Sequence, residues 1–342
     1  MERVLAAGLL AMVISILLGP KFIDFLRRNE FGQMIREEGP AGHVSKQGTP
    51  TAGGLMMVIS MTVPFLALSH WTPEGLTVYG VTMACAAIGF VDDYIKVHHR
   101  RSLGLSGRWK LLFIAGISVG VGLVVHDLDF DTAVYVPVVD WRVQLAFAFY
   151  VLLFLILAGA ANGANLTDGI DGLAVGVGII ALLTFTAMNV FTYIRSSQVA
   201  SEQDLAALDQ AILGAALIGG AIGFLWYNAF PAEVFMGDTG SMAIGGALGG
   251  FAIMSQSELL LILIGGIFVV EALSVILQVV SYKRWGRRIF LMTPIHHHFE
   301  MKAWSETKIM VRFWIAAAIL CGAAFALYYQ YLRGFRPDLF TS

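Results

Sequence analysis

The chain has 342 residues, of which 57% are hydrophobic and 13% are charged, and its mean hydropathy is +0.74. Because an ordinary soluble domain has roughly 25% charged residues, this composition excludes a soluble globular protein and indicates a helical protein that crosses a membrane many times. The net charge of −2 says little about partners, and no nucleic-acid partner is expected. Both cysteines, Cys85 and Cys321, lie inside apolar runs, so neither a disulfide framework nor a thiolate metal site is supported.

Hydropathy predicts ten membrane spans, each near the length of about 20 residues that an α-helix needs to cross a bilayer. The expected spans are residues 3–19, 53–70, 75–91, 110–126, 143–161, 173–194, 210–227, 239–255, 258–282 and 309–332. The first run could imitate a signal peptide, but Gly19-Pro20-Lys21 is no cleavage site, so we expect a helix. Gly265 and Gly266 would let the ninth span bend or pack closely against a neighbour.

Lysine and arginine are distributed unequally between the two ends of these spans. Sixteen follow spans one, three and nine, whereas five lie on the opposite side. The positive-inside rule therefore places the basic loops in the cytoplasm and both chain termini outside. On the external side, residues 133–139 are β-prone around Pro137, which is compatible with a small hairpin.

The unusual polar sequence falls into five loops on the predicted cytoplasmic face, and all five are rich in Gly, Asp, Asn, His or Lys. They are residues 32–54, 92–110, 162–172, 228–241 and 283–308. Because these loops converge on one end of a helical bundle, they predict a functional site there.

The first loop contains the run H-V-S-K-Q-G-T-P-T-A-G-G from His43 to Gly54. Its glycines make the backbone flexible, and Lys46 and Thr51 offer a cation and a hydroxyl. We expect an anion-binding loop, although the spacing is not that of a P-loop.

Asp92 and Asp93 follow the third span, where the hydropathy places the C-terminus of a helix. Carboxylates at that end oppose the helix dipole by roughly 0.3–1 kcal/mol each, and adjacent acids raise one another's pKa. The structural alternative is an ion pair with Lys96, one turn further on. The functional interpretation is a metal–phosphate site or a general base.

The stretch from 162 to 172 reads N-G-A-N-L-T-D-G-I-D-G and contains Asn162, Asn165, Asp168 and Asp171 but no Lys or Arg. Its two carboxylates, three residues apart, are expected on one side of a starting helix turn. Taken alone, the stretch is also typical of a turn followed by an Asp N-cap. Its place beside the other polar loops favours a site.

Asp238 opens the eighth span in the run F-M-G-D-T-G-S. A helix N-cap is the structural alternative. Gly237 and Gly240 allow a phosphate to approach the backbone closely. A carboxylate at this position could hold Mg²⁺ against phosphate oxygens, since Mg²⁺ prefers oxygen ligands.

Three consecutive histidines, His296, His297 and His298, follow Pro294 inside the chain and are therefore no expression tag. Consecutive side chains diverge in a helix or a strand, so one shared metal ion is not expected. Hydrogen bonds to a phosphate or a sugar are the functional interpretation, and a polar interfacial loop is the structural alternative.

Taken together, five motifs resemble the phospho-N-acetylmuramoyl-pentapeptide transferase (MraY) family of the polyprenyl-phosphate N-acetylhexosamine-1-phosphate transferase superfamily. They are G-T-P-T-A-G-G at 48–54, D-D-Y at 92–94, N-G-A-N-L-T-D-G-I-D-G-L-A at 162–174, V-F-M-G-D-T-G-S at 234–241 and P-I-H-H-H-F-E at 294–300. One departure is Ala52, where the family pattern leads us to expect Met. The resemblance covers essentially the whole chain and implies an all-α polytopic membrane protein with residues 1–342 as a single integral-membrane catalytic domain.

The resemblance further implies transfer of phospho-MurNAc-pentapeptide from UDP-MurNAc-pentapeptide to undecaprenyl phosphate, which yields UMP and lipid I for peptidoglycan synthesis. Mg²⁺ is the implied cofactor, and the bacterial inner membrane is the implied location, with the active site facing the cytoplasm. The expected partners are the two substrates and the lipid bilayer, and a homodimer is left open.

Roles are implied at the positions that match the motifs. Asp238 would hold Mg²⁺, with Asp168 as the other predicted metal residue, and Asp92 would deprotonate the lipid phosphate with support from Asp93. The residues expected to bind substrate or shape its pocket are Lys46, Thr51, Lys96, Asn162, Asn165, Asp168, Asp171, Asn228, Phe235, His296, His297 and His298. Phe235 would stack on the uracil, and His296 and His297 would hold the diphosphate or the sugar.

Three alternatives remain at this level. Asp238 or Asp92 could first take the phosphosugar covalently, in a two-step reaction. A relative that transfers GlcNAc-1-phosphate is a second candidate, against which the three histidines argue. An ion-coupled transporter is the third, but the acids cluster at helix ends, and Glu271 is the one clearly mid-helix acid.

Overall fold

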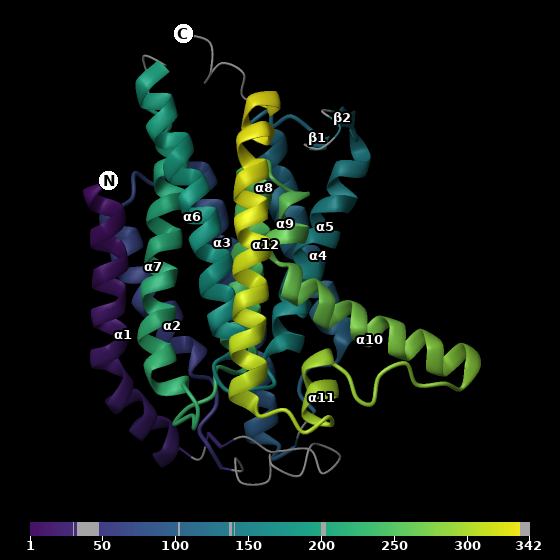
Figure 1. Ribbon diagram of the computed structural model, residues 1–342. Coiled ribbons are helices and arrows are strands. Elements are labelled where there is room, and N and C mark those ends of the chain that lie inside the picture. Colours follow the sequence, from purple (N-terminus) through teal and green to yellow (C-terminus); the bar gives the residue numbers. More distant parts are fainter. Residues whose placement is uncertain are drawn as a thin grey trace.

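A computed structural model describes residues 1–29, 31–32, 48–101, 103–136, 139, 141–199 and 203–335, so the predicted residues His43 and Lys46 lie outside the described parts. These parts form a helical bundle (Figure 1). The helices are α1 (Glu2–Arg28), α2 (Gly54–Leu68), α3 (Pro73–His98), α4 (Gly107–Asp127), α5 (Phe147–Thr167), α6 (Leu173–Val199), α7 (Leu205–Asn228), α8 (Gly237–Met254), α9 (Leu260–Ile264), α10 (Gly266–Trp285), α11 (Ile295–Glu300) and α12 (Glu306–Phe335).

Eight of the described helices are long and apolar enough to cross a membrane, namely α1, α3, α4, α5, α6, α7, α10 and α12. Helix α2 is apolar but has only 15 residues, and α8 is buried inside the bundle. The prediction of an all-α polytopic membrane protein is confirmed, whereas the count of ten spans stays a prediction. The start of α1 and the C-terminal end of α12 lie at the end of the bundle opposite α11 (Figure 1).

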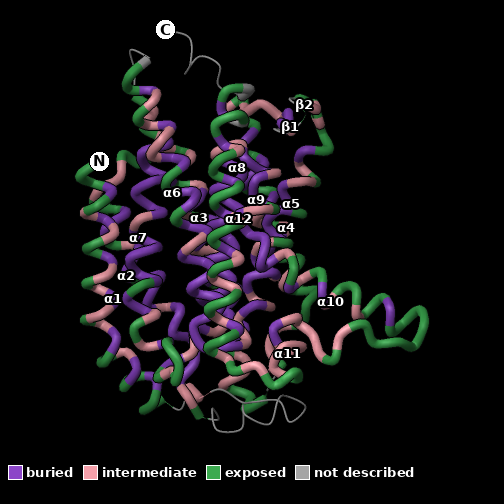
Figure 2. Tube along the Cα trace, viewed as in Figure 1, coloured by how far each residue is buried: buried purple, intermediate pink, exposed green. Residues whose placement is uncertain are grey.

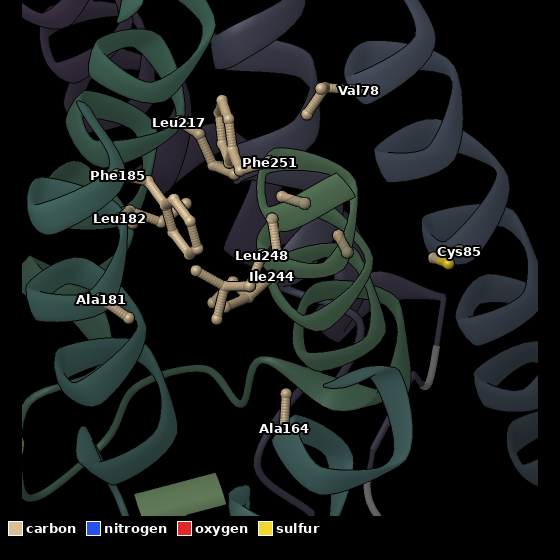
Figure 3. Close-up of a cluster of buried hydrophobic side chains, with 14 of the residues drawn as sticks. Val78, Cys85, Ala164, Ala181, Leu182, Phe185, Leu217, Ile244, Leu248 and Phe251 are labelled. Atoms are coloured by element: carbon tan, nitrogen blue, oxygen red, sulfur yellow. The ribbon is translucent and has the colours of Figure 1, made fainter. Parts of the chain in front are cut away.

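Helix α8 forms the centre of the bundle, and its residues 238–254 are all buried. Figure 3 shows Phe251 of α8 beside Phe185 of α6 and Leu217 of α7. The two phenylalanine rings stack with their centroids 5.9 Å apart. Because lipid is as apolar as these side chains, close packing stabilises such contacts more than transfer out of water does.

Helix α3 packs directly on α8, and glycine makes the approach close. A Cβ atom added at Gly89 of α3 would lie 2.1 Å from the carbonyl oxygen of Asp238 in α8. No side chain fits in that space, so glycine is required at the point where the two helices bring their polar residues together.

The predicted ninth span is divided at Gly265 into α9 and α10, which confirms the expected bend. Helix α10 leaves the bundle at a steep angle (Figure 1), and its far half is mostly exposed (Figure 2). Its exposed side chains include Leu273, Ile276 and Leu277, which are apolar, as a lipid-facing surface requires.

A small antiparallel hairpin lies at the end of the bundle where the chain starts. Strand β1 (Ala133–Val136) pairs with β2 (Trp141–Gln144), with Ala133 opposite Gln144. The hairpin expected between spans four and five is therefore confirmed.

Candidate active site

Helix α3 continues beyond the predicted end of its span, to His98. Asp92 and Asp93 therefore lie within the helix, and their expected position at its C-terminus was wrong. Lys96 explains the extension, because its Nζ lies 2.6 Å from Asp92 Oδ2 one turn earlier, and a cation in the last turn complements the helix dipole. The predicted structural alternative, an ion pair with Lys96, is confirmed.

Two lysines and two aspartates form a cluster of alternating charge where α3, α4 and α8 meet. Lys96 Nζ also lies 2.8 Å from Asp238 Oδ1. Lys110 Nζ lies 3.0 Å from Asp92 Oδ1 and 2.5 Å from Asp238 Oδ2. The backbone N–H of Leu105 donates to Asp92 Oδ1 at 2.7 Å. Asp92 is 1% and Asp238 9% exposed, and charges buried so deeply require such pairing.

Asp93, the neighbour of Asp92, caps helix α8. Its Oδ1 accepts the backbone N–H of Asp238 at 3.0 Å. Its Oδ2 accepts the backbone N–H of Thr239 at 3.0 Å and the Thr239 hydroxyl at 2.6 Å. The first N–H groups of a helix lack partners within that helix, so a carboxylate from α3 satisfies them here. Asp238 is thus not an N-cap, since α8 begins at Gly237 and Met236 precedes it.

The same three carboxylates form the candidate metal centre. One oxygen each from Asp92, Asp93 and Asp238 lies within 4.8 Å of the others, and no other group of this kind occurs among the described residues. An all-oxygen donor set fits Mg²⁺ or Ca²⁺ rather than a thiolate- or imidazole-seeking metal. The donor set therefore fits the implied cofactor.

Asp168, the other predicted metal residue, lies outside this group. Burial raises the pKa of its carboxyl to about 8, and the negative charges of Asp238 and Asp93 act in the same direction. Because Asp238 and Asp93 influence its pKa, Asp168 lies near the carboxylate cluster. Its role as a ligand stays a prediction.

The stretch from 162 to 172 spans the end of α5 and the turn before α6. The expected starting helix turn was wrong: Asp168 is the C-cap of α5, and α6 begins only at Leu173. An Asn side chain at the end of α5 joins this stretch to α8, because Asn165 Nδ2 donates to Ser241 Oγ at 3.0 Å. Asn162, in contrast, donates to the Ala158 carbonyl within its own helix.

The loops next to this stretch are held by side chains that were predicted to bind substrate. Buried Asn228 accepts the Gly172 N–H at 3.0 Å and donates to the Val234 carbonyl at 2.9 Å. Asp171 Oδ2 accepts the Ala232 N–H at 3.1 Å. These contacts brace the loops, and direct substrate contacts by Asn228 and Asp171 stay predictions.

The first polar loop pairs with the loop before α8 through backbone groups. The N–H of Phe235 donates to the Pro50 carbonyl at 2.7 Å, and the N–H of Gly53 donates to the Phe235 carbonyl at 2.9 Å. Thr51 is buried and Phe235 is half-buried. Thr51 and Phe235 therefore lie in two segments that are joined by backbone hydrogen bonds. Lys46 lies outside the described residues.

The three histidines lie in helix α11, directly after its first residue, and take separate partners, as their predicted divergence requires. His297 Nδ1 lies 2.5 Å from Glu300 Oε2. His298 Nδ1 accepts the Leu291 N–H at 3.1 Å. Partial burial, with the charge of Lys302, lowers the pKa of His298, and a neutral ring is what an accepting Nδ1 requires.

His296 is fully buried and faces two other elements of the site. Its Nδ1 lies 3.0 Å from Glu271 Oε1 of α10. A Cβ atom added at Gly169 would lie 2.3 Å from its Nε2. The histidine loop and the stretch from 162 to 172 therefore touch, as the predicted convergence of the loops requires.

The sequence interpretation missed two members of this constellation. Lys110 was counted only as a predicted cytoplasmic charge. Nothing in the sequence around it indicates that it lies close to Asp92 and Asp238, because it belongs to α4 and to none of the motifs. Glu271 was noted only as the acid that would suit a transporter. A charged residue in an apolar span was the available signal, and its partner is His296 of the candidate site.

The chain is similar to a known family over part of its length and to individual proteins along nearly its whole length. Residues 76–256 match the family model described as glycosyl transferase family 4. Proteins named phospho-N-acetylmuramoyl-pentapeptide-transferase from Bacillus pumilus (strain SAFR-032) and Bacillus subtilis (strain 168) are each 44% identical over 323 residues, which cover 93% of this chain and 96% of the relative. The protein of the same name from Halalkalibacterium halodurans is 43% identical over 342 residues, covering 97% of this chain and 98% of the relative.

Proposed function

Because this chain belongs to the phospho-N-acetylmuramoyl-pentapeptide-transferase family, we propose that it transfers phospho-MurNAc-pentapeptide from UDP-MurNAc-pentapeptide to undecaprenyl phosphate. The products are UMP and lipid I. The observation that carries the proposal is the cluster of buried Asp92 and Asp238 with Lys96 and Lys110, whose members come from three different helices. Phosphoryl transfer depends mainly on positioning and on neutralising charge, and this cluster supplies both.

In the proposed reaction, an oxygen of the lipid phosphate attacks the phosphorus that carries the sugar. The bond from this phosphorus to the bridging oxygen breaks, and UMP leaves with that oxygen. Asp92 takes the proton that the lipid phosphate carries. Lys96 and Lys110, which both pair with Asp92, neutralise the negative charge that the diphosphate oxygens gain. In the alternative two-step route, the carboxylate of Asp92 or Asp238 attacks the same phosphorus and expels UMP, and the lipid phosphate then attacks the resulting acyl phosphate and releases the carboxylate.

The cofactor in this proposal is Mg²⁺, held by Asp238 with Asp92 and Asp93 as neighbouring oxygen donors. When bound, it neutralises charge on the diphosphate oxygens. Asp93 also has a structural role that needs no metal, because it caps α8 and so fixes the backbone of Asp238. Asp168 would border the same region in its protonated form.

One substrate of this reaction is soluble and the other is a lipid, so the site must lie where water meets the bilayer. The polar cluster occupies the ends of apolar helices, and the excess of Lys and Arg in the same loops favours the cytoplasmic face. The proposed location is the bacterial inner membrane. A homodimer is not part of the proposal.

The test is UMP release by the purified protein in detergent, with UDP-MurNAc-pentapeptide and a polyprenyl phosphate. We expect release only with the lipid, the muramyl donor and Mg²⁺ all present. Release with UDP-GlcNAc as the sole donor would instead indicate a GlcNAc-1-phosphate transferase. No release by folded protein would overturn the proposal. Near-normal turnover of Asp92→Asn would remove the base assignment.

A further inference from the structure

Glu271 and His296 form a buried pair that the proposed reaction does not yet use. Both side chains are 0% exposed, and Oε1 of Glu271 lies 3.0 Å from Nδ1 of His296. Within the described residues, the second oxygen of Glu271 and the second nitrogen of His296 have no hydrogen-bond partner. The pair joins α10, which leaves the bundle, to α11, which carries the histidines.

The hydrogen-bonding capacity of this pair follows from its geometry. A carboxylate only accepts hydrogen bonds, so Oε1 of Glu271 accepts from Nδ1–H of His296. With an anion beside Nε2, the ring donates from both nitrogens, one hydrogen bond to Glu271 and one to the anion.

The position of Nε2 indicates what this donor meets. It lies against Gly169, where an added Cβ would come within 2.3 Å, and Gly169 follows Asp168 in the turn after α5. A buried N–H without a protein acceptor is unfavourable unless a ligand supplies one. An anionic phosphate oxygen is a strong acceptor for such a donor.

We propose that Glu271 is a positioning residue, which fixes His296 so that Nε2–H donates to the diphosphate of the nucleotide-sugar donor beside Gly169. This inference rests on the proposed function and names the contact through which the histidine loop serves it. Glu271 acts only through His296 and does not itself contact the substrate. Carboxylates that orient metal-bound or catalytic histidines act in the same indirect way.

The rival explanation is that Glu271 only holds α11 onto α10. A thermodynamic cycle with Glu271→Gln, His296→Ala and the double variant separates the two explanations. Glutamine keeps the size of the side chain but neither carries the charge nor enforces the proton arrangement. Three quantities are measured for each variant: the affinity for UDP-MurNAc-pentapeptide without lipid, the KM for this donor and the KM for polyprenyl phosphate.

We expect Glu271→Gln to weaken donor binding by about tenfold and to leave the KM for polyprenyl phosphate within about twofold of the wild-type value. The substitution should have no further effect in the His296→Ala background. Ser274→Ala is the matched control, because Ser274 bonds the Glu271 carbonyl on the same helix turn without touching the carboxylate. It should bind donor within about twofold of wild type.

Two results would overturn the inference. One is unchanged donor affinity in Glu271→Gln, and the other is a loss in the double variant equal to the product of the single losses. Thermal unfolding of each variant identifies a misfolded protein, and Ser274→Ala then provides the folded comparison. If wild-type protein neither binds nor turns over the muramyl donor, the proposed function fails. If only the Glu271 results fail, the function stands without this contact.

Discussion

The carboxylate of Asp93 in α3 accepts the backbone N–H of Asp238 in α8 at 3.0 Å. The cap of α8 is therefore supplied by another helix. Because Asp92 is the next residue of α3, this contact also sets the distance between Asp92 and Asp238, which share Lys96 and Lys110. The cap and the charge cluster are thus positioned by one helix–helix contact.

Replacing Asp93 by alanine should lower both stability and activity. Loss of a helix cap costs about 0.5–2 kcal/mol, and Asp238 would lose its fixed backbone. Asp204→Ala is the matched control, since Asp204 caps α7 through the Ala207 N–H at 2.9 Å. Both variants should melt at lower temperature than wild type, but only Asp93→Ala should lose UMP release when assayed below its melting temperature. Equal activity of the two variants would contradict this prediction.

The α3–α8 contact predicts opposite effects for two glycines of the same helix. Gly89→Ala places a Cβ 2.1 Å from the Asp238 carbonyl oxygen, whereas Gly80→Ala meets no atom within 4 Å. We expect Gly89→Ala to separate the helices, with a large fall in melting temperature and loss of activity. Gly80→Ala should keep or raise stability, because alanine favours helix over glycine by about 1 kcal/mol. Thermal unfolding in detergent compares them, and similar melting temperatures would show that the helices can yield.

Lys110 should be essential although it belongs to none of the motifs. Lys110→Met leaves Asp92 and Asp238 with Lys96 as their remaining partner in the cluster, so we expect activity to fall by about 100-fold or more. Added Mg²⁺ should raise the melting temperature of this variant more than that of wild type, because a second cation then offsets the buried negative charge. Arg101→Met, which removes an exposed cation from the connection between α3 and α4, is the control and should behave as wild type.

The raised pKa of Asp168 predicts a pH-dependent stability difference. An unfolded Asp titrates near 3.9, whereas the folded carboxyl titrates at about 8. The folded state therefore binds the proton more tightly, and its stability falls as pH rises from about 4 to about 8. Asp168→Asn removes this dependence. In EDTA, the melting temperature of the variant relative to wild type should rise between pH 6 and pH 8 and level off above that range. A constant difference would show that Asp168 is already ionised at pH 6.

Local patterns were informative where the physical cause was local. Consecutive histidines diverge in a regular element, and His296, His297 and His298 indeed take different partners. Paired glycines at 265 and 266 predicted a bend, and the helix breaks there. The position of Asp92 and Asp93 was wrong for a local reason too, since hydropathy ends a span at the first charges, whereas the helix continues to His98.

The sequence by itself determined that this is a polytopic helical membrane protein, because composition alone sets hydropathy, and its motifs predicted five polar loops at one end of the bundle. Only the tertiary structure decided which atoms meet. In the tertiary structure, Asp93 caps the start of α8, Lys110 pairs with Asp92 and Asp238, and Glu271 lies beside His296. Each of these contacts joins residues from different helices, and their closeness depends on how the helices pack rather than on any spacing along the chain.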